Sequence, residues 1–106
     1  MSQISIQDSE DFDSRLANAG EKLVVVNFYA PWCTPCKMIA PLIEALTLIH
    51  TNVIFLKVDV DEVEEVALRY DISHIPTYIY IKNGEVVQEV YGANIVAFTL
   101  ALETNQ

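Results

Sequence analysis

The sequence predicts an α/β fold in which a central mixed sheet of five strands is flanked by four helices, as one domain over residues 1–106. Two largely apolar patterns, Leu23–Tyr29 and Val53–Val58, are typical of parallel strands that are buried on both faces. Helical patterns alternate with these strands, which favours helical crossovers between parallel strands. Asn83-Gly84 lies between two further strand patterns and predicts an antiparallel hairpin.

The chain begins with a strand, a helix and another strand. Ile4–Gln7 is the short first strand. Asp8 or Ser9 caps the helix, which runs to about Ala19, and Gly20 ends it. The apolar strand Leu23–Tyr29 then leads into the longest helix of the chain.

That long helix is expected from about Cys33 to His50. Pro41 falls inside it, removes one backbone donor and should kink it. The apolar residues expected to form its buried stripe are Ile39, Leu42, Ile43, Leu46 and Ile49.

The second half adds a helix, a hairpin and a closing helix. Asp61 begins a capping box with Glu64 at the start of the third helix. The hairpin strands are Thr77–Ile81 and Val86–Tyr91, and Asn94 caps the last helix. The residues expected to face the core from these two helices are Val63, Val66, Ala67, Tyr70, Ile95, Phe98, Thr99 and Leu102.

The charge balance excludes several classes of partner. Six Lys and Arg residues stand against fifteen Asp and Glu residues, for a net charge of −9. Such a surface repels phosphate backbones and anionic lipid head groups, so neither nucleic acid nor membrane is expected as a partner. No apolar run approaches the roughly 18–20 residues of a membrane span. Met1–Ile6 lacks the features of a secretory signal, so a cytoplasmic location is expected.

The chemical site is expected at the turn between a strand and a helix. Cys33 and Cys36 are the only cysteines, and their spacing lets one helical turn bring the sulfurs within bonding distance. Cys33 lies at the helix N-terminus, where free N–H groups stabilise a thiolate, whereas Cys36 should be shielded and keep its proton longer. Pro35 fits the first turn and stiffens it. The pattern predicts two-step exchange: Cys33 attacks a substrate disulfide, and Cys36 then resolves the mixed disulfide.

Two other interpretations of the cysteine pair are weaker. A structural zinc site needs four ligands, and only His50 and His74 could join the cysteines. Because His50 lies at the far end of the long helix, no metal site is expected. A purely structural disulfide is also disfavoured, since so small a ring removes little chain entropy.

Several motifs together make the chain resemble the thioredoxin family, most closely the short cytosolic thioredoxins of animals. The segments that carry the resemblance are Trp32-Cys33-x-Pro35-Cys36-Lys37, Pro41, Val58-Asp59-Val60-Asp61, Ile75-Pro76-Thr77, Lys82-Asn83-Gly84 and Gly92-Ala93. They occur in matching order over nearly the whole chain. The resemblance implies a thioredoxin-like fold and a protein-disulfide reductase.

The resemblance also implies roles for individual residues. Cys33 matches the attacking cysteine and Cys36 the resolving one, while Trp32 flanks and shapes the site. Pro76 matches a cis-proline that faces the cysteines, beside which the Ile75 backbone pairs with an extended substrate segment. Gly92 matches a glycine at the lip of the substrate groove, with a plain turn glycine as the alternative.

The family's cofactors belong to a partner. The resemblance implies thioredoxin reductase, a flavin- and NADPH-dependent enzyme, as the partner that regenerates the dithiol, and disulfide-containing proteins as substrates. This chain has no nucleotide motif, so NADPH and FAD are expected only on that reductase and no cofactor is expected here.

The chain departs from the family pattern at two positions. Asn27 stands where the family usually has Asp, and an amide cannot act as a general base at neutral pH. We therefore expect Asn27 to slow the Cys36 step while costing less to bury than a carboxylate, and Lys57 to lack its usual partner. Thr34 stands where Gly is usual, and its hydroxyl either donates to the Cys33 sulfur or points to solvent.

Several questions of function stay open at this point. His74 precedes Ile75-Pro76 and either modulates a thiolate or is an exposed loop residue without a role. The acidic residues Asp59–Glu65 either form a solvated helix start or select partners by charge. The alternatives to a reductase are a redox-inactive binding module on the same fold and a more oxidising, isomerase-like variant.

Overall fold

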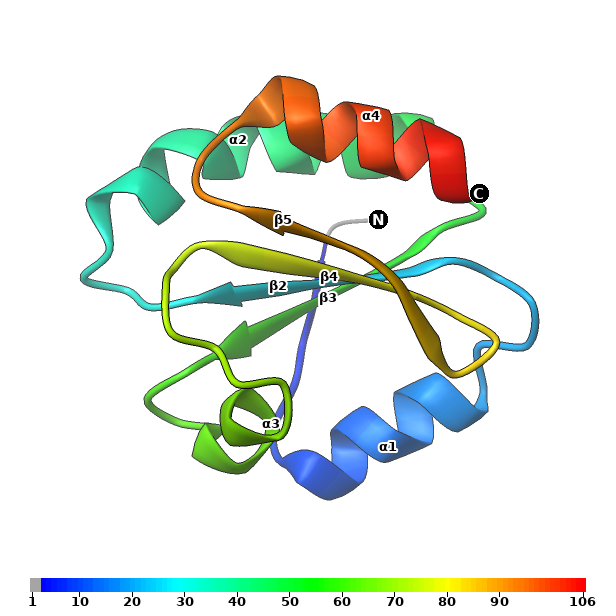
Figure 1. The fold of residues 1–106 in the computed structure, drawn as a ribbon, viewed down its shortest axis with the longest axis horizontal. Helices are drawn as coiled ribbons and strands as arrows, with labels where there is room; N and C mark the ends of the chain where they lie inside the picture. Colours follow the sequence, from blue (N-terminus) through cyan, green and yellow to red (C-terminus); the bar gives the residue numbers. More distant parts are fainter. Residues whose placement is uncertain (1–2) are drawn as a thin grey trace.

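The computed structural model describes residues 3–106 and contains one five-stranded sheet (Figure 1). The strand order across the sheet is β1-β3-β2-β4-β5, so β2 and β3 lie near the middle. The strands are β1 (Ile4–Ser5), β2 (Val24–Tyr29), β3 (Ile54–Asp59), β4 (Thr77–Lys82) and β5 (Glu85–Tyr91). The predicted strands are confirmed, with β1 shorter than expected. Met1 and Ser2, which begin the segment examined for a secretory signal, lie outside the described residues.

The sheet is mixed, as predicted. β3 runs parallel to both β1 and β2, whereas β4 runs antiparallel to β2 and β5 antiparallel to β4. The β4–β5 hairpin turns at Asn83 and Gly84, with φ angles of 54° and 80°. These positive φ values explain why an Asn-Gly pair occupies the turn.

Four helices cover the two faces of the sheet (Figure 1). They are α1 (Ser9–Ala17), α2 (Thr34–Ile49), α3 (Glu64–Arg69) and α4 (Ile95–Asn105). α2 and α4 cover one face, and α1 and α3 cover the other. Each face of the central strand β2 is therefore buried, which is why its sequence is nearly all apolar.

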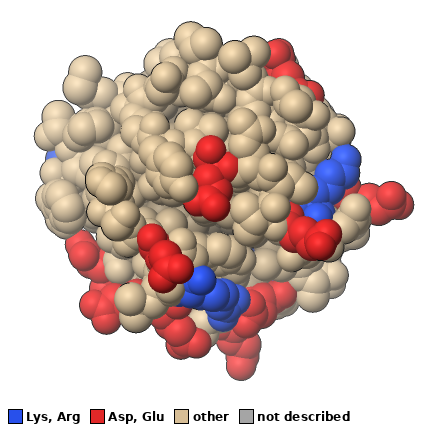
Figure 2. Space-filling model, viewed as in Figure 1, with Lys and Arg blue, Asp and Glu red and all other residues tan. Residues whose placement is uncertain are grey.

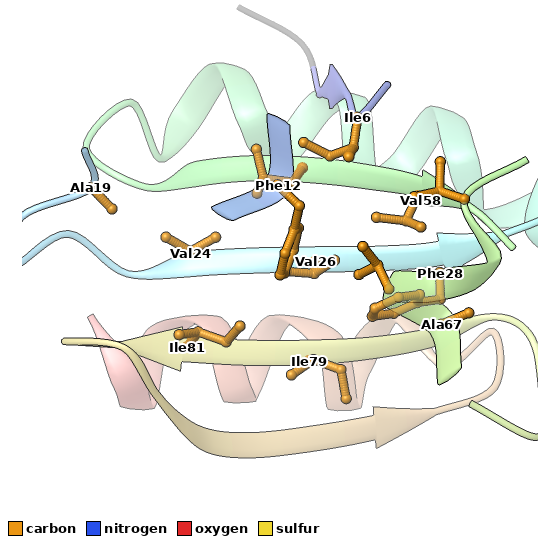
Figure 3. Packing of buried hydrophobic residues seen from close by; sticks show 13 residues of the cluster. Ile6, Phe12, Ala19, Val24, Val26, Phe28, Val58, Ala67, Ile79 and Ile81 are labelled. Atoms are coloured by element: carbon orange, nitrogen blue, oxygen red, sulfur yellow. The ribbon is translucent and has the colours of Figure 1, made fainter. Parts of the chain in front are cut away.

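The core divides into two layers, one on each side of the sheet. On the α1 and α3 side, Val24, Val26 and Phe28 of β2 pack with Phe12 of α1 (Figure 3). On the other side, Val25 packs in a cluster with the residues Ile39, Ile43, Tyr78, Tyr80, Phe98 and Leu102. Tyr78 and Tyr80 of β4 are fully buried aromatic residues of this layer.

Helix caps agree with the sequence at two of three predicted positions. Asp8 caps α1 by accepting a hydrogen bond from the Asp11 backbone, and Asn94 caps α4 in the same way. The predicted capping box of Asp61 and Glu64 is wrong. α3 begins only at Glu64 and has no side-chain cap. The backbone N–H of Asp61 donates to Asp59 Oδ1, and the Asp61 carboxylate accepts a hydrogen bond from Trp32.

The buried stripe of α2 differs from the predicted one. Leu42 and Ile49 are 50% and 70% exposed, and Leu46 is half-buried. The residues of α2 that are buried are Cys36, Ile39, Ile43 and Thr47. Apolar residues occur all round this helix, so its sequence alone does not determine which face meets the sheet.

Charge is unevenly distributed over the surface (Figure 2). In this view, acidic side chains crowd the lower edge, where α1 and α3 lie, whereas α2 and α4 present a largely uncharged surface. The large apolar side chains exposed on α2 and α4 are Met38, Leu42, Leu48, Ile49, Val96 and Leu100. Among residues 3–106, no helix is long and apolar enough to cross a membrane.

Candidate functional site

The cysteine pair lies where β2 leads into α2, as predicted. Cys33 is the N-cap of α2, and its Sγ accepts a hydrogen bond of 3.3 Å from the backbone N–H of Cys36. Thr34 is the first helical residue and Pro35 follows in the first turn, where a missing N–H costs little. The helix N-terminus therefore points the backbone N–H of Cys36 at the Cys33 sulfur.

Cys33 and Cys36 form a disulfide, with their Cα atoms 5.3 Å apart. Both are buried, with 4% and 7% exposure, and they pack with Ala30 against Ile75. Cys36 is shielded, as predicted, and in this disulfide form Cys33 is buried in the same cluster. Hydrogen bonding, not burial, distinguishes the two sulfurs.

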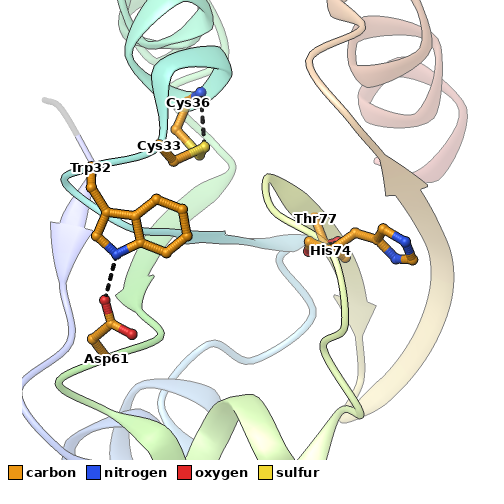
Figure 4. The surroundings of a disulfide bond; sticks show 6 residues. All are labelled: Trp32, Cys33, Cys36, Asp61, His74 and Thr77. Atoms are coloured by element: carbon orange, nitrogen blue, oxygen red, sulfur yellow. Dashed lines mark hydrogen bonds between the residues drawn. A yellow bond between two sulfur atoms is a disulfide. The ribbon is translucent and has the colours of Figure 1, made fainter.

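Trp32 lies beside the cysteines and is held by Asp61, which the sequence predicted as a helix cap and not as a partner of Trp32. Its indole Nε1 donates a 2.8 Å hydrogen bond to Asp61 Oδ2, although the indole is 67% exposed (Figure 4). A signal for Asp61 exists in the sequence. Parallel strands end at the same edge of a sheet, so the residues after β3 lie near the residues after β2.

The loop before β4 and the segment after β5 meet at the site. The Ile75-Pro76 bond is cis, as expected. Ile75 packs against the cysteine cluster, and the backbone N–H of Gly92 donates a 2.8 Å hydrogen bond to the Pro76 carbonyl. Gly92 has a φ of 84°, which favours glycine. Ile75, Pro76 and Gly92 thus lie together next to the cysteines.

A pocket of about 320 Å³ lies on the other side of Cys36 and is also lined by Asn27, Lys37 and Lys57. Asn27 is 9% exposed and is paired in register with Lys57. Its Nδ2 donates a 3.1 Å hydrogen bond to Gln3 Oε1, while its Oδ1 is buried without a partner among residues 3–106. Asn27 is therefore a buried amide that is only half satisfied.

Lys57 faces an aromatic ring in place of the carboxylate that the family usually supplies. Its ammonium lies 5.5 Å from the centroid of the Tyr29 ring, within the range of a cation–π contact. Burial raises the pKa of the Tyr29 hydroxyl, and the carboxylates of Asp59 and Glu62 raise it further. The phenol is thus uncharged at neutral pH and offers Lys57 its ring.

The structure does not bring His74 to the cysteines. Its imidazole points away from the disulfide (Figure 4), is exposed, and shares a hydrogen bond of 3.0 Å with Ser73 Oγ. Of the residues before Pro76, Ile75 packs against the cysteine cluster and the His74 side chain does not. The geometry favours the interpretation of His74 as an exposed loop residue.

Within residues 3–106, no three His, Cys, Asp or Glu side chains are grouped so that they could hold a metal ion. The cysteine pair is occupied by its own disulfide. A cysteine pair that closes this disulfide supports exchange between a dithiol and a disulfide.

Comparison with known proteins agrees with this geometry. The thioredoxin family model matches residues 3–101. Thioredoxin-2 of Saccharomyces cerevisiae is 46% identical over 100 residues, covering 94% of this chain and 95% of the yeast protein. Thioredoxin of Gallus gallus is 47% identical over 90 residues, covering 85% and 86%. The X-ray structure of Fasciola hepatica thioredoxin superposes with a TM-score of 0.96 at 35% identity, covering 98% of this chain and 100% of that one.

The fold, the disulfide at the N-terminus of α2 and these matches lead to one conclusion. The five-stranded mixed sheet and four helices are those of thioredoxin structures, so the predicted fold is confirmed. An intact cysteine pair in a chain of this kind disfavours a redox-inactive binding module. The chain belongs to the thioredoxin family and is a thiol–disulfide oxidoreductase.

Proposed function

We propose that the protein, acting as a single domain, reduces disulfides in other proteins, with Cys33 as the attacking and Cys36 as the resolving cysteine. The observation that carries the proposal is the position of Cys33 Sγ at the N-terminus of α2, where it accepts the Cys36 N–H. Backbone donors and the helix dipole at this end stabilise a thiolate. Cys36 has no corresponding donor among the hydrogen bonds of residues 3–106.

The exchange proceeds in two balanced steps. The Cys33 thiolate attacks one sulfur of the substrate disulfide, so that a Cys33–substrate bond forms and the other substrate sulfur leaves as a thiolate. Cys36 then loses its proton and attacks Cys33 Sγ, which closes the internal disulfide and releases the second substrate sulfur. The substrate gains two electrons, and the two cysteines lose them.

The residues around the disulfide form the proposed substrate groove. Trp32 offers an exposed apolar surface beside the cysteines. The Ile75 backbone lies at the edge of the cysteine cluster, where an extended substrate segment could pair with it, and Gly92 borders it through its hydrogen bond to Pro76. Thr34 and Pro35 set the local geometry of the first turn.

The oxidised protein needs an external source of electrons. We propose a thioredoxin reductase as that partner, with NADPH and FAD acting only on the reductase, and a cytoplasmic setting, where thiols are kept reduced. The net charge of −9 supports protein substrates over nucleic acids or anionic membranes.

Insulin reduction tests the proposal. The parent dithiol protein, recycled by NADPH and a thioredoxin reductase, should reduce insulin and consume NADPH, whereas Cys33→Ser should do neither. Cys36→Ser should instead accumulate a covalent mixed disulfide with the substrate. Equal insulin reduction by the parent and Cys33→Ser would refute the proposal, and a redox titration against glutathione distinguishes a reductant from an isomerase-like oxidant.

A further inference from the structure

A chain of three side chains links the surface of α2 to the buried amide beside Cys36. Glu44 Oε2 accepts a 3.0 Å hydrogen bond from Gln3 Nε2 and a longer one, 3.5 Å, from the Gln3 backbone N–H. At its other end, Gln3 Oε1 accepts a 3.1 Å hydrogen bond from Asn27 Nδ2. The three residues come from α2, from the segment before β1, and from β2.

This row of hydrogen bonds has a direction, because the Glu44 carboxylate can only accept hydrogen bonds. An ionised carboxylate offers no donor, so Gln3 must turn its Nε2 toward Glu44. Gln3 then presents its Oε1, an acceptor, to Asn27, so Asn27 must donate from its Nδ2. The atom left over at the end of the chain is Asn27 Oδ1, an acceptor.

That acceptor is buried, and its residue lines the same pocket as the resolving cysteine. Oδ1 has no hydrogen-bond partner among residues 3–106, and Asn27 and Cys36 line the same pocket of about 320 Å³. A buried acceptor without a donor costs free energy. A protonation state of Cys36 that supplies a donor removes this cost and is therefore favoured. A cysteine thiol supplies one, and a thiolate does not.

We infer that Glu44, acting through Gln3, holds the Asn27 amide so that Oδ1 accepts a hydrogen bond from the Cys36 thiol in the reduced protein. This arrangement stabilises the protonated form of Cys36 and delays its attack on the mixed disulfide. Gln3 and Glu44 are thus positioning residues for the resolving step. The inference rests on the proposed function in requiring the dithiol form.

Other charged and titratable groups face the same pocket. Lys37 of α2 and Lys57 of β3 favour a thiolate through their positive charge, and the Tyr29 phenol of β2 lies next to Lys57. Cys33 lies across the disulfide. Cys33 is replaced by Ser in every protein compared below and the other groups are unaltered, so their contributions cancel in the comparison.

The test measures the pKa of Cys36 as the single thiol in a Cys33→Ser background, from the pH dependence of iodoacetamide alkylation. Gln3→Met removes both side-chain hydrogen bonds of Gln3 and keeps the Glu44 charge. Glu44→Gln allows the donors and acceptors of the row to exchange places, which turns Asn27 Nδ2 toward Cys36. Both should lower the pKa of Cys36 by about one unit, a roughly tenfold rise in thiolate at a pH below the pKa. Glu103→Gln, which removes an exposed carboxylate of α4, is the control and should leave the pKa unchanged.

The outcomes separate a directed chain from simple charge. Gln3→Glu keeps an acceptor opposite Asn27, so the pKa of Cys36 should not fall in that variant. A pKa that stays at the parent value in Gln3→Met overturns the inference, as does a shift seen in Glu44→Gln alone, which would reflect charge only. Circular dichroism confirms folding of each variant. Insulin reduction by the unmodified dithiol is measured separately, so the proposed function can stand if this inference fails.

Discussion

The Trp32 indole donates a 2.8 Å hydrogen bond to Asp61, a residue 29 positions away, although most of its ring is open to solvent. The contact connects the segment after β2 with the segment after β3. It orients the aromatic surface next to the disulfide and contributes little to the core.

Removing the acceptor for the indole should therefore affect substrate handling more than stability. Asp61→Ala should raise the KM for insulin reduction a few-fold while lowering the free energy of unfolding by at most about 1 kcal/mol, since the bond is exposed. Because Trp32 is the only tryptophan, its fluorescence reports the change directly. Asp61→Asn keeps an acceptor oxygen and should lie close to the parent, and Glu64→Gln is a charge-matched control. An unchanged KM in Asp61→Ala would contradict the orienting role.

Asn27→Asp restores the carboxylate usual in the family. It should lower the stability of the fold and raise the rate of the resolving step. A buried carboxylate near Cys36 can accept its proton, so the resolving step should accelerate. The free energy of unfolding at neutral pH should fall by about 1–3 kcal/mol, because a charge is harder to bury than an amide. Stopped-flow turnover and urea unfolding measure the two effects. If neither quantity changes, Asn27 has no part in the resolving step or in stability.

Tyr78 and Tyr80 are matched tyrosines with opposite expectations. Both are fully buried, but Tyr80 donates a 2.8 Å hydrogen bond to the Phe98 carbonyl, whereas the Tyr78 hydroxyl has no partner among residues 3–106. Tyr80→Phe should lower the free energy of unfolding by about 1 kcal/mol, and Tyr78→Phe should leave it unchanged or raise it by a similar amount. Urea titration distinguishes the two, and equal losses in both would show that the Tyr78 hydroxyl is satisfied.

The same tyrosines should make the fold sensitive to alkali. Burial raises the pKa of Tyr78 and of Tyr80 above the usual value of about 10. Above that pH the unfolded chain loses phenol protons that the folded chain keeps, so the stability present below pH ~10 declines as the pH rises. The decline should be shallower in Tyr78→Phe. Thermal unfolding between about pH 8 and 11 measures it, and parallel curves for parent and variant would contradict the prediction.

Alanine substitutions at Gly92 and Gly84 should strain the backbone equally, so comparing them tests whether Gly92 borders the substrate groove. Their φ angles are 84° and 80°, and in both cases an added Cβ meets no atom within 4 Å. Alanine at either position should cost about 1 kcal/mol of strain. Only Gly92 is bonded to Pro76 beside the cysteines, so only Gly92→Ala should raise the KM for insulin. A KM that rises equally in Gly84→Ala would assign the effect to stability.

The sequence predicted the element order and the chemical centre because both depend on local signals. Apolar strands, Asx caps at Asp8 and Asn94, and the Asn83-Gly84 turn follow from residues a few positions apart. The place of Cys33 at a helix N-terminus follows in the same way. The sequence therefore determined which residues carry the sulfur chemistry and where the helix that bears them begins.

Only the tertiary structure decided which distant side chains surround that centre. The buried face of α2 depends on its contact with the sheet, because Leu42 and Ile49 are as apolar as the residues that are buried. Asp61 binds Trp32 instead of capping α3, and Gln3 reaches Asn27, because pairing with β3 brings their segments together. Such contacts depend on strand order and register, which no local pattern encodes.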